Sequence, residues 1–162
     1  MNVADRASRV KLLVLDVDGV LTDGRLYYDA SGETMKAFHV HDGYGLKRWH
    51  DAGGHSAIIS GRKSAIVEKR ASELGIEFVY QGRDDKATAL AELLSAADMS
   101  ADECCFVGDD TLDVQVMELV GFAVAVANAH GDAKSAAHYL TKLDGGRGAV
   151  REVTDLLIEA QK

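Results

Sequence analysis

Apolar residues recur along the chain in short, nearly unbroken runs that are separated by segments of mixed polarity. Each run has roughly the 4–8 residues expected of a strand, and an apolar run without alternation is typical of a strand buried on both faces of a parallel sheet. These runs occupy residues 10–15, 55–60, 76–80, 103–109 and 121–127.

Segments with apolar residues at helical spacing lie between the runs. The spacing predicts helices over residues 45–51, 63–74, 86–97 and 112–120, and a last helix over 149–160. Strands that alternate with helices indicate an α/β fold, in which right-handed crossovers build a doubly wound, Rossmann-like, mainly parallel sheet. A chain of 162 residues is long enough for one domain and short for two, so we expect residues 1–162 to form a single domain.

Residues 24–40 depart from this alternation. They contain two strand-like arms around Asp29-Ala30-Ser31-Gly32, a pattern typical of a β-hairpin. The hairpin directly follows the first predicted strand, where an open α/β sheet places its ligand crevice. We therefore expect it to cover a functional site, to contact another subunit, or both. The sequence leaves no room for an inserted cap domain.

Composition and charge narrow the classes of partner. The net charge of −8 argues against nucleic acid, which needs a basic surface. No apolar run approaches the ~20 residues of a membrane span, and the first residues lack the apolar stretch of a secretory signal. Cys104 and Cys105 are adjacent in an apolar run, so they point to opposite faces of a strand and indicate no disulfide. We expect a cytoplasmic protein with no membrane partner.

The strongest chemical signal is DVDGVLTDG at residues 16–24. Residues two apart in a strand share a face, so Asp16 and Asp18 project to the same side at the end of the first strand. Two neighbouring carboxylates repel each other unless a cation or a proton resolves the conflict. An Asp-Gly turn alone would explain Asp18 and Gly19, but it does not explain a second aspartate two residues earlier.

A second acidic cluster, GDDTLD, follows the fourth apolar run and contains Asp109, Asp110 and Asp113. One aspartate here would be an ordinary helix cap, but three within five residues exceed what capping requires. If the strand before Asp109 neighbours the strand before Asp16, their carboxylates converge. A few hard oxygen ligands with room for water and phosphate suit Mg²⁺.

Two further positions fit a phosphate site. Ser60, in IISGR, ends the second apolar run, and Lys86 opens the third predicted helix. Taken alone, Ser60 would be a helix N-cap and Lys86 a solvated surface charge. They gain weight only in combination with the aspartates.

In this order and near these spacings, DxDGVxTDG, SGR, a lysine and GDDxxD are similar to the motifs of the haloacid dehalogenase superfamily of phosphatases. The match is closer to the capless branch of that superfamily, which the 3-deoxy-D-manno-octulosonate 8-phosphate phosphatases typify. KAFHVHDGYGLK at residues 36–47 and GGRGAVREV at residues 145–153 also resemble that branch. The likeness therefore covers almost the whole chain.

The resemblance implies a role for each candidate residue. Asp16 would be the nucleophile that takes the phosphoryl group. Asp18 would protonate the leaving oxygen and then activate water. Mg²⁺ would be held by Asp16, Asp109 and the backbone carbonyl of Asp18. The supporting positions are Ser60 and Lys86 for the transferring oxygens, Thr22 and Arg62 for substrate contact, Asp113 for orienting Lys86, and Asp110 for the metal shell.

The resemblance also implies an activity and an assembly. The favoured activity is Mg²⁺-dependent hydrolysis of a small sugar phosphate, 3-deoxy-D-manno-octulosonate 8-phosphate, in lipopolysaccharide precursor synthesis. A nine-carbon ulosonate 9-phosphate is the alternative substrate. The branch is tetrameric, with the hairpin at the centre of the assembly, so we expect a homotetramer.

Two alternatives without turnover are a phosphoacceptor signalling domain and a silenced relative that serves only in assembly. Asp18 favours the enzyme over the signalling domain, because an acid/base group two residues after the acceptor is needed only for rapid hydrolysis. The presence of Asp16, Asp18, Lys86 and Asp109 argues against a silenced relative.

Overall fold

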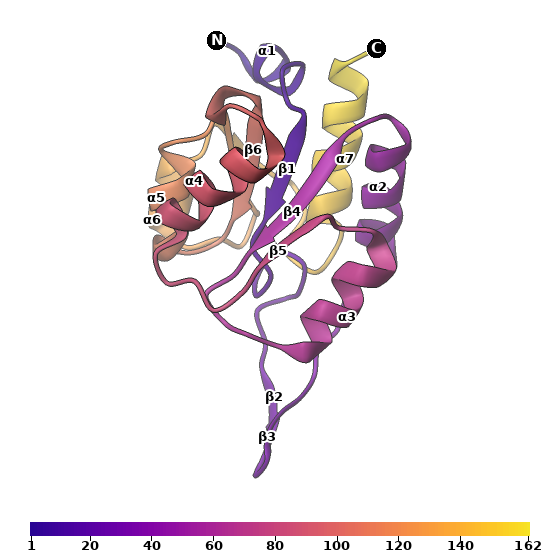
Figure 1. Ribbon diagram of the computed structural model, residues 1–162, viewed down its shortest axis with the longest axis vertical. Coiled ribbons are helices and arrows are strands. Elements are labelled where there is room, and N and C mark those ends of the chain that lie inside the picture. Colours follow the sequence, from indigo (N-terminus) through magenta and orange to yellow (C-terminus); the bar gives the residue numbers. More distant parts are fainter.

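A parallel six-stranded sheet forms the centre of the computed structural model, which describes residues 1–162 (Figure 1). The strand order is β5-β4-β1-β6-β7-β8, so the chain winds outward in both directions from β1. This confirms the predicted doubly wound α/β fold. The strands are β1 (Leu12–Leu15), β4 (His55–Ile59), β5 (Phe78–Tyr80), β6 (Cys104–Gly108), β7 (Phe122–Ala125) and β8 (Tyr139–Leu140). The two residues of β8 are too few to give a pattern in the sequence.

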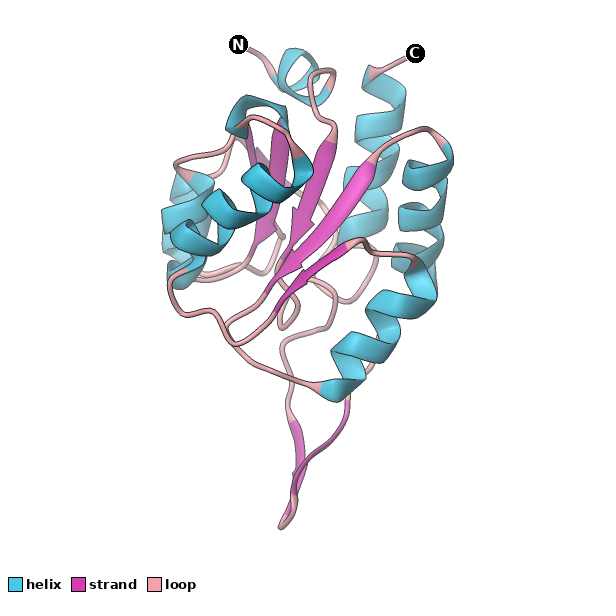
Figure 2. Cartoon of the chain, viewed as in Figure 1, coloured by secondary structure: helices cyan, strands magenta, loops and turns pink.

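Helices cover both faces of the sheet (Figures 1 and 2). One layer holds α2 (Val40–Asp51), α3 (Ala65–Leu74) and α7 (Ala149–Ala160), and the other holds α4 (Lys86–Ala97), α5 (Val114–Met117) and α6 (Gly131–Ala136). The short α1 (Val3–Ala7) packs beside α7. No helix combines the length and the apolar character that crossing a membrane requires.

Several helices differ from the prediction: α1 and α6 were not predicted, α3 begins two residues later than expected, and two more helices differ in their bounds. The helix expected from residue 45 begins at Val40, because the side chain of His39 accepts the N–H of His41 and caps the helix. The helix expected over residues 112–120 is a 3₁₀ turn (Thr111–Asp113) followed by the short α5. Asp110 and Asp113 form a capping box at that turn, so the acidic residues set its local structure.

The sheet is buried because its strands carry apolar residues on both faces. Every residue of β1, β6 and β7 is buried, as the unbroken apolar runs predict. The buried apolar side chains form one connected cluster, and Trp49, Phe106 and Phe122 are its largest members. The indole N–H of Trp49 donates to the carbonyl of His55 over 2.8 Å, which ties α2 to the start of β4.

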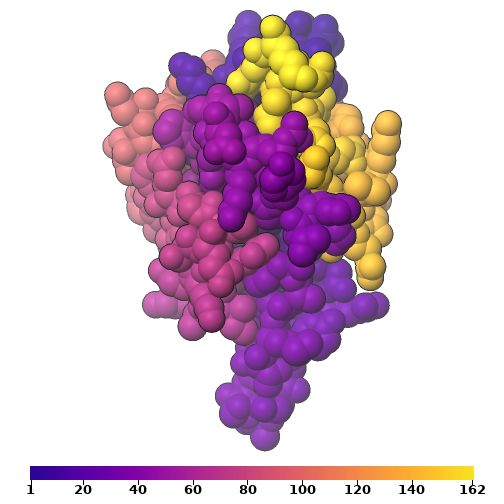
Figure 3. Space-filling model, turned by 90° about the vertical axis from the view of Figure 1, so that its right-hand side faces the viewer, coloured from indigo at the N-terminus to yellow at the C-terminus, as the bar shows by residue number.

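The predicted hairpin is present as a separate two-stranded antiparallel sheet of β2 (Tyr27–Asp29) and β3 (Gly32–Met35). The carboxylate of Asp29 closes its turn by accepting the N–H of Ser31 over 2.7 Å. The hairpin projects away from the body of the molecule (Figures 1 and 3). Tyr28 and Met35 are exposed on it, at 58% and 52% of their surface.

Candidate active site

The predicted site residues gather where the neighbouring strands β4, β1 and β6 end. Asp16 follows β1, Ser60 follows β4 and Asp109 follows β6, and the parallel register brings these positions to one edge of the sheet. A cavity of about 260 Å³ opens there. It is lined by all of the predicted site residues except Thr22, namely Asp16, Asp18, Ser60, Arg62, Lys86, Asp109, Asp110 and Asp113, together with Gly24, Gly61 and Leu112.

Lys86 is a buried cation held between two carboxylates. Its ammonium Nζ lies 2.6 Å from Oδ1 of Asp113 and 3.1 Å from Oδ1 of Asp16, and only 4% of its side chain is exposed. Burial opposes the charged form of Lys86, but the charges of Asp16 and Asp113 outweigh it and raise the pKa of the ammonium. A fixed, charged donor therefore lies beside the carboxylate of Asp16.

Asp113 holds the loop after β6 in place, in addition to contacting Lys86. Its Oδ2 accepts the backbone N–H of Asp109 over 2.8 Å and that of Asp110 over 3.2 Å. A Cβ at Gly108 would lie 2.6 Å from the Cβ of Asp113, so glycine is what lets Asp113 approach the strand so closely. The sequence-based role for Asp113, orienting Lys86, agrees with this geometry.

Three carboxylates form a compact cluster beside Lys86. Oxygens of Asp16, Asp109 and Asp113 lie within 4.8 Å of one another. Burial, reinforced by the charges of Asp16 and Asp113, raises the pKa of Asp109 to about 8. Burial and then Asp113 raise the pKa of Asp16 to about 6, while Lys86 opposes the shift. One lysine does not balance this charge, and hard oxygen donors with uncompensated negative charge fit Mg²⁺.

Gly19 makes room for the cluster. Its φ of +91° lies in the left-handed region, and a Cβ there would lie 1.8 Å from Oδ2 of Asp109. A side chain at this position would therefore be strained and would displace the carboxylate. The glycine that the sequence suggests as a turn residue is also what brings the loop after β1 against Asp109.

Asp18 lines the cavity, and its carboxylate lies near two cations that do not contact the carboxylates of the cluster. Its Oδ1 is 2.6 Å from the ammonium of Lys36, and its Oδ2 is 3.7 Å from Nε of Arg62. Lys36 also lies 2.8 Å from Glu33. Sequence reasoning gave neither Lys36 nor Glu33 a role. Their only signal was that both lie in the predicted hairpin of residues 24–40 and that Lys36 begins the stretch 36–47 that resembles the family, because a charge in a hairpin is ordinarily solvated.

Thr22 is the one predicted site residue that the structure does not place in the lining of the cavity. Thr22 is only 2% exposed and does not line the cavity. Its Oγ1 accepts the N–H of Gly19 and the N–H of Gly24, each over 3.2 Å. These two bonds show that the hydroxyl holds the loop after β1 in shape, while its predicted contact with a substrate stays a prediction. Ser60, also 2% exposed, remains at the cavity wall.

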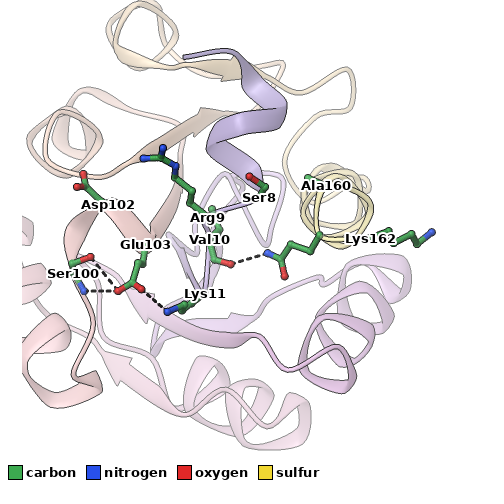
Figure 4. Close-up of a pocket in the computed structure, with 10 residues that line it drawn as sticks. Ser8, Arg9, Val10, Lys11, Ser100, Asp102, Glu103, Ala160 and Lys162 are labelled. Carbon is green, nitrogen blue, oxygen red and sulfur yellow. Dashed lines mark hydrogen bonds and ion pairs between the residues drawn. The ribbon is translucent and has the colours of Figure 1, made fainter.

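A larger hollow, of about 810 Å³, lies at the opposite end of the sheet (Figure 4). It adjoins the starts of β1 and β6 and contains none of the predicted site residues. Its walls carry the exposed ion pair of Lys11 and Glu103, 2.6 Å apart. In open α/β sheets, ligands bind at the carboxyl ends of the strands. Geometry and the clustered ionisable groups therefore both select the smaller cavity.

Comparisons with known proteins identify the family of the chain. Residues 72–152 match a family model described as haloacid dehalogenase-like hydrolase. The chain is 46% identical over 160 residues to the 3-deoxy-D-manno-octulosonate 8-phosphate phosphatase of Yersinia pestis, covering 99% of this chain and 86% of the relative. It is 48% identical over 160 residues to the protein of that name from Escherichia coli K12, covering 99% and 85%.

Solved structures are also similar to this chain over nearly its whole length. The crystal structure of the Yersinia pestis phosphatase superposes with a TM-score of 0.96 at 46% identity, over 98% of this chain and 86% of that one. The phosphatase of Moraxella catarrhalis, solved in complex with magnesium ion, phosphate ion and a KDO molecule, has a TM-score of 0.95 at 42% identity, over 98% and 91%.

The chain therefore belongs to the haloacid dehalogenase-like hydrolase family. Within that family, it is similar over nearly its whole length to the 3-deoxy-D-manno-octulosonate 8-phosphate phosphatases. The predicted superfamily is thus confirmed. The roles of individual site residues stay predictions.

Proposed function

We propose that this protein is a Mg²⁺-dependent phosphatase that hydrolyses 3-deoxy-D-manno-octulosonate 8-phosphate to the free sugar and phosphate. The observation that carries the proposal is Asp16, held 3.1 Å from a buried Lys86 inside a carboxylate cluster that fits a divalent cation. The names of relatives at 46–48% identity supply the substrate. The proposed reaction supports lipopolysaccharide precursor synthesis in the cytoplasm.

The proposed reaction has two displacements at phosphorus. An oxygen of Asp16 attacks the phosphoryl group, the bond from phosphorus to the sugar oxygen breaks, and Asp18 gives that oxygen a proton. Water then attacks the phosphoryl group on Asp16 and loses a proton to Asp18, and phosphate leaves with Asp16 restored. Lys86 and Ser60 position the phosphoryl oxygens, because phosphoryl transfer depends mainly on positioning and charge stabilisation.

The proposed metal ligands are the side chains of Asp16 and Asp109 and the backbone carbonyl of Asp18. When bound, Mg²⁺ shields the attacking carboxylate from the negative charge of the substrate. Asp113 lies in the same cluster, but its oxygens already accept from Lys86 and from two backbone N–H groups. We assign Asp113 to holding the site together, and Asp110, which accepts the N–H of Thr111 over 2.7 Å, to supporting the loop.

We also propose that the protein is a homotetramer assembled through the hairpin. Large apolar side chains are exposed on the hairpin and on the first turns of α2, namely Leu26, Tyr28, Met35, Val40 and Tyr44. Exposed apolar side chains gathered in one region are typical of an interaction surface. Sedimentation should show a tetramer that Val40→Asp weakens, and a fully active monomer would refute the proposal.

The test of the activity is phosphate release from two candidate substrates, 3-deoxy-D-manno-octulosonate 8-phosphate and a nine-carbon ulosonate 9-phosphate. Each is measured with Mg²⁺ and with chelator, beside the Asp16→Asn variant. We expect Mg²⁺-dependent preference for the eight-carbon substrate and no turnover by the variant. Preference for the nine-carbon substrate would overturn the assigned substrate, and turnover by Asp16→Asn near the normal rate would overturn the nucleophile.

A further inference from the structure

A partly buried ion pair joins the hairpin to the catalytic loop. Lys36 directly follows β3 and has only 1% of its side chain exposed. Its ammonium lies 2.6 Å from Oδ1 of Asp18 and 2.8 Å from Oε1 of Glu33. A buried ammonium with two carboxylate partners has one position, unlike a lysine in solvent.

The hairpin end of this ion pair is anchored to the body of the molecule. The second oxygen of Glu33 accepts the hydroxyl proton of Ser64 over 2.6 Å. Ser64 is itself buried and caps α3. Glu33 therefore holds Lys36 against the start of α3. Lys36 in turn holds the carboxylate of Asp18 in place.

We propose that Lys36 is a positioning residue that holds Asp18 for its proton transfers, an inference that rests on the proposed function. Lys36 engages Oδ1 of the Asp18 carboxylate and leaves Oδ2 as the atom that gives and takes the proton. The other cation at Asp18 holds it less firmly. Arg62 is 3.7 Å from Oδ2, and 44% of its side chain is exposed. Without Lys36, the Asp18 carboxylate is free to rotate out of reach of the leaving oxygen.

Comparing two leaving groups distinguishes a positioning role of Lys36 from a purely structural one, because only one of the leaving groups needs a proton from Asp18. In the first displacement, the oxygen of a sugar leaves with a proton from Asp18. A 4-nitrophenolate ion is stable without that proton, so its release does not need Asp18. In the second displacement, Asp18 takes a proton from water whichever substrate was used. Proton transfer by a positioned group is worth about 10²- to 10⁴-fold in rate, so a mispositioned Asp18 has a measurable cost.

The test variant is Lys36→Met, which removes the charge and keeps an unbranched side chain. With Mg²⁺ present, we expect kcat/KM for the sugar phosphate to fall by about 10- to 100-fold. With 4-nitrophenyl phosphate, kcat/KM should change by less than about threefold, because it reports only the steps up to release of the leaving group. Since the second displacement becomes slow, 4-nitrophenolate should appear in a burst approaching one equivalent per active site.

Further variants distinguish positioning from general damage to the hairpin. Lys36→Arg keeps a cation and should restore part of the activity toward the sugar phosphate. Thr34→Val breaks the bond from the Thr34 hydroxyl to the carbonyl of Tyr27, 3.0 Å long, without touching Asp18, and should leave the ratio of the two kcat/KM values unchanged. Lys142→Met makes the same substitution at an exposed lysine and should also leave it unchanged.

If Lys36→Met does not fold because Glu33 is left without its partner, the double variant Lys36→Met with Glu33→Gln removes both charges and carries the same expectations. Equal losses of kcat/KM for both substrates, with no burst, would overturn the positioning role. Failure of the proposed function itself would appear in the wild-type protein, as absence of turnover of the sugar phosphate. The role of Lys36 is judged separately, by dividing kcat/KM of the variant by kcat/KM of the wild type for each substrate.

Discussion

Replacing Thr22 by valine tests how the loop after β1 is held. Thr22 is 2% exposed, and its hydroxyl accepts the N–H of Gly19 in a buried bond and that of Gly24 in a partly buried one. Valine has nearly the same shape, so it leaves no cavity but removes the acceptor. A buried donor without a partner costs about 1–3 kcal/mol. Because Gly24 reaches water in part, we expect a total loss of about 2–4 kcal/mol.

Urea denaturation in the presence of chelator measures this loss without a contribution from bound metal. For a chain of this size, a loss of 1 kcal/mol in the free energy of unfolding lowers the melting temperature by roughly 2–4 °C. In a separate thermal melt, Thr22→Val should therefore unfold about 5–15 °C below the wild-type protein. Thr22→Ser is the matched control. It keeps the hydroxyl and loses one methyl group, worth about 0.8 kcal/mol. If Thr22→Val is as stable as Thr22→Ser, the hydroxyl does not support the loop and our reasoning is wrong.

Three further predictions concern the carboxylate cluster. Gly19→Ala places a Cβ against Asp109, so calorimetric titration should show Mg²⁺ binding weakened by about tenfold or more, corresponding to at least 1.4 kcal/mol; unchanged affinity would contradict the close approach. Asp113→Ala leaves Lys86 with Asp16 as its one carboxylate partner and leaves two backbone N–H groups without an acceptor, so urea denaturation should show a loss of about 3–5 kcal/mol, and Asp113→Asn a smaller one because its amide oxygen still accepts. Asp109 has a pKa of about 8 in the folded state against 3.8 as its ordinary value, so folding favours its protonated form. Without metal, stability should therefore fall as pH rises from about 6.5 to about 8, where histidines are mostly neutral. Mg²⁺ or Asp109→Asn should flatten this dependence, and an equally steep fall in the Asp109→Asn variant would assign it to other groups.

The sequence alone was sufficient for the alternation of strands and helices and for the chemistry at the strand ends. A strand buried on both faces must be apolar, so its position is visible as a nearly unbroken apolar run, as within residues 10–15 and 103–109. The aspartates that follow these runs are conspicuous because a carboxylate at the end of a buried strand has no role in packing. Local pattern therefore predicted both the fold class and Asp16, Asp18 and Asp109 as candidates.

Only the tertiary structure decided how these groups pair. That β1 lies between β4 and β6, that Thr22 turns inward to the backbone, and that Lys36 reaches Asp18 all depend on contacts between segments brought together by folding. Hydrophobic periodicity reports whether a position is buried, but it carries no information about which distant residue faces it. A lysine in a hairpin and a threonine in a loop have ordinary local patterns. Their contacts arise from the direction in which the folded backbone points them.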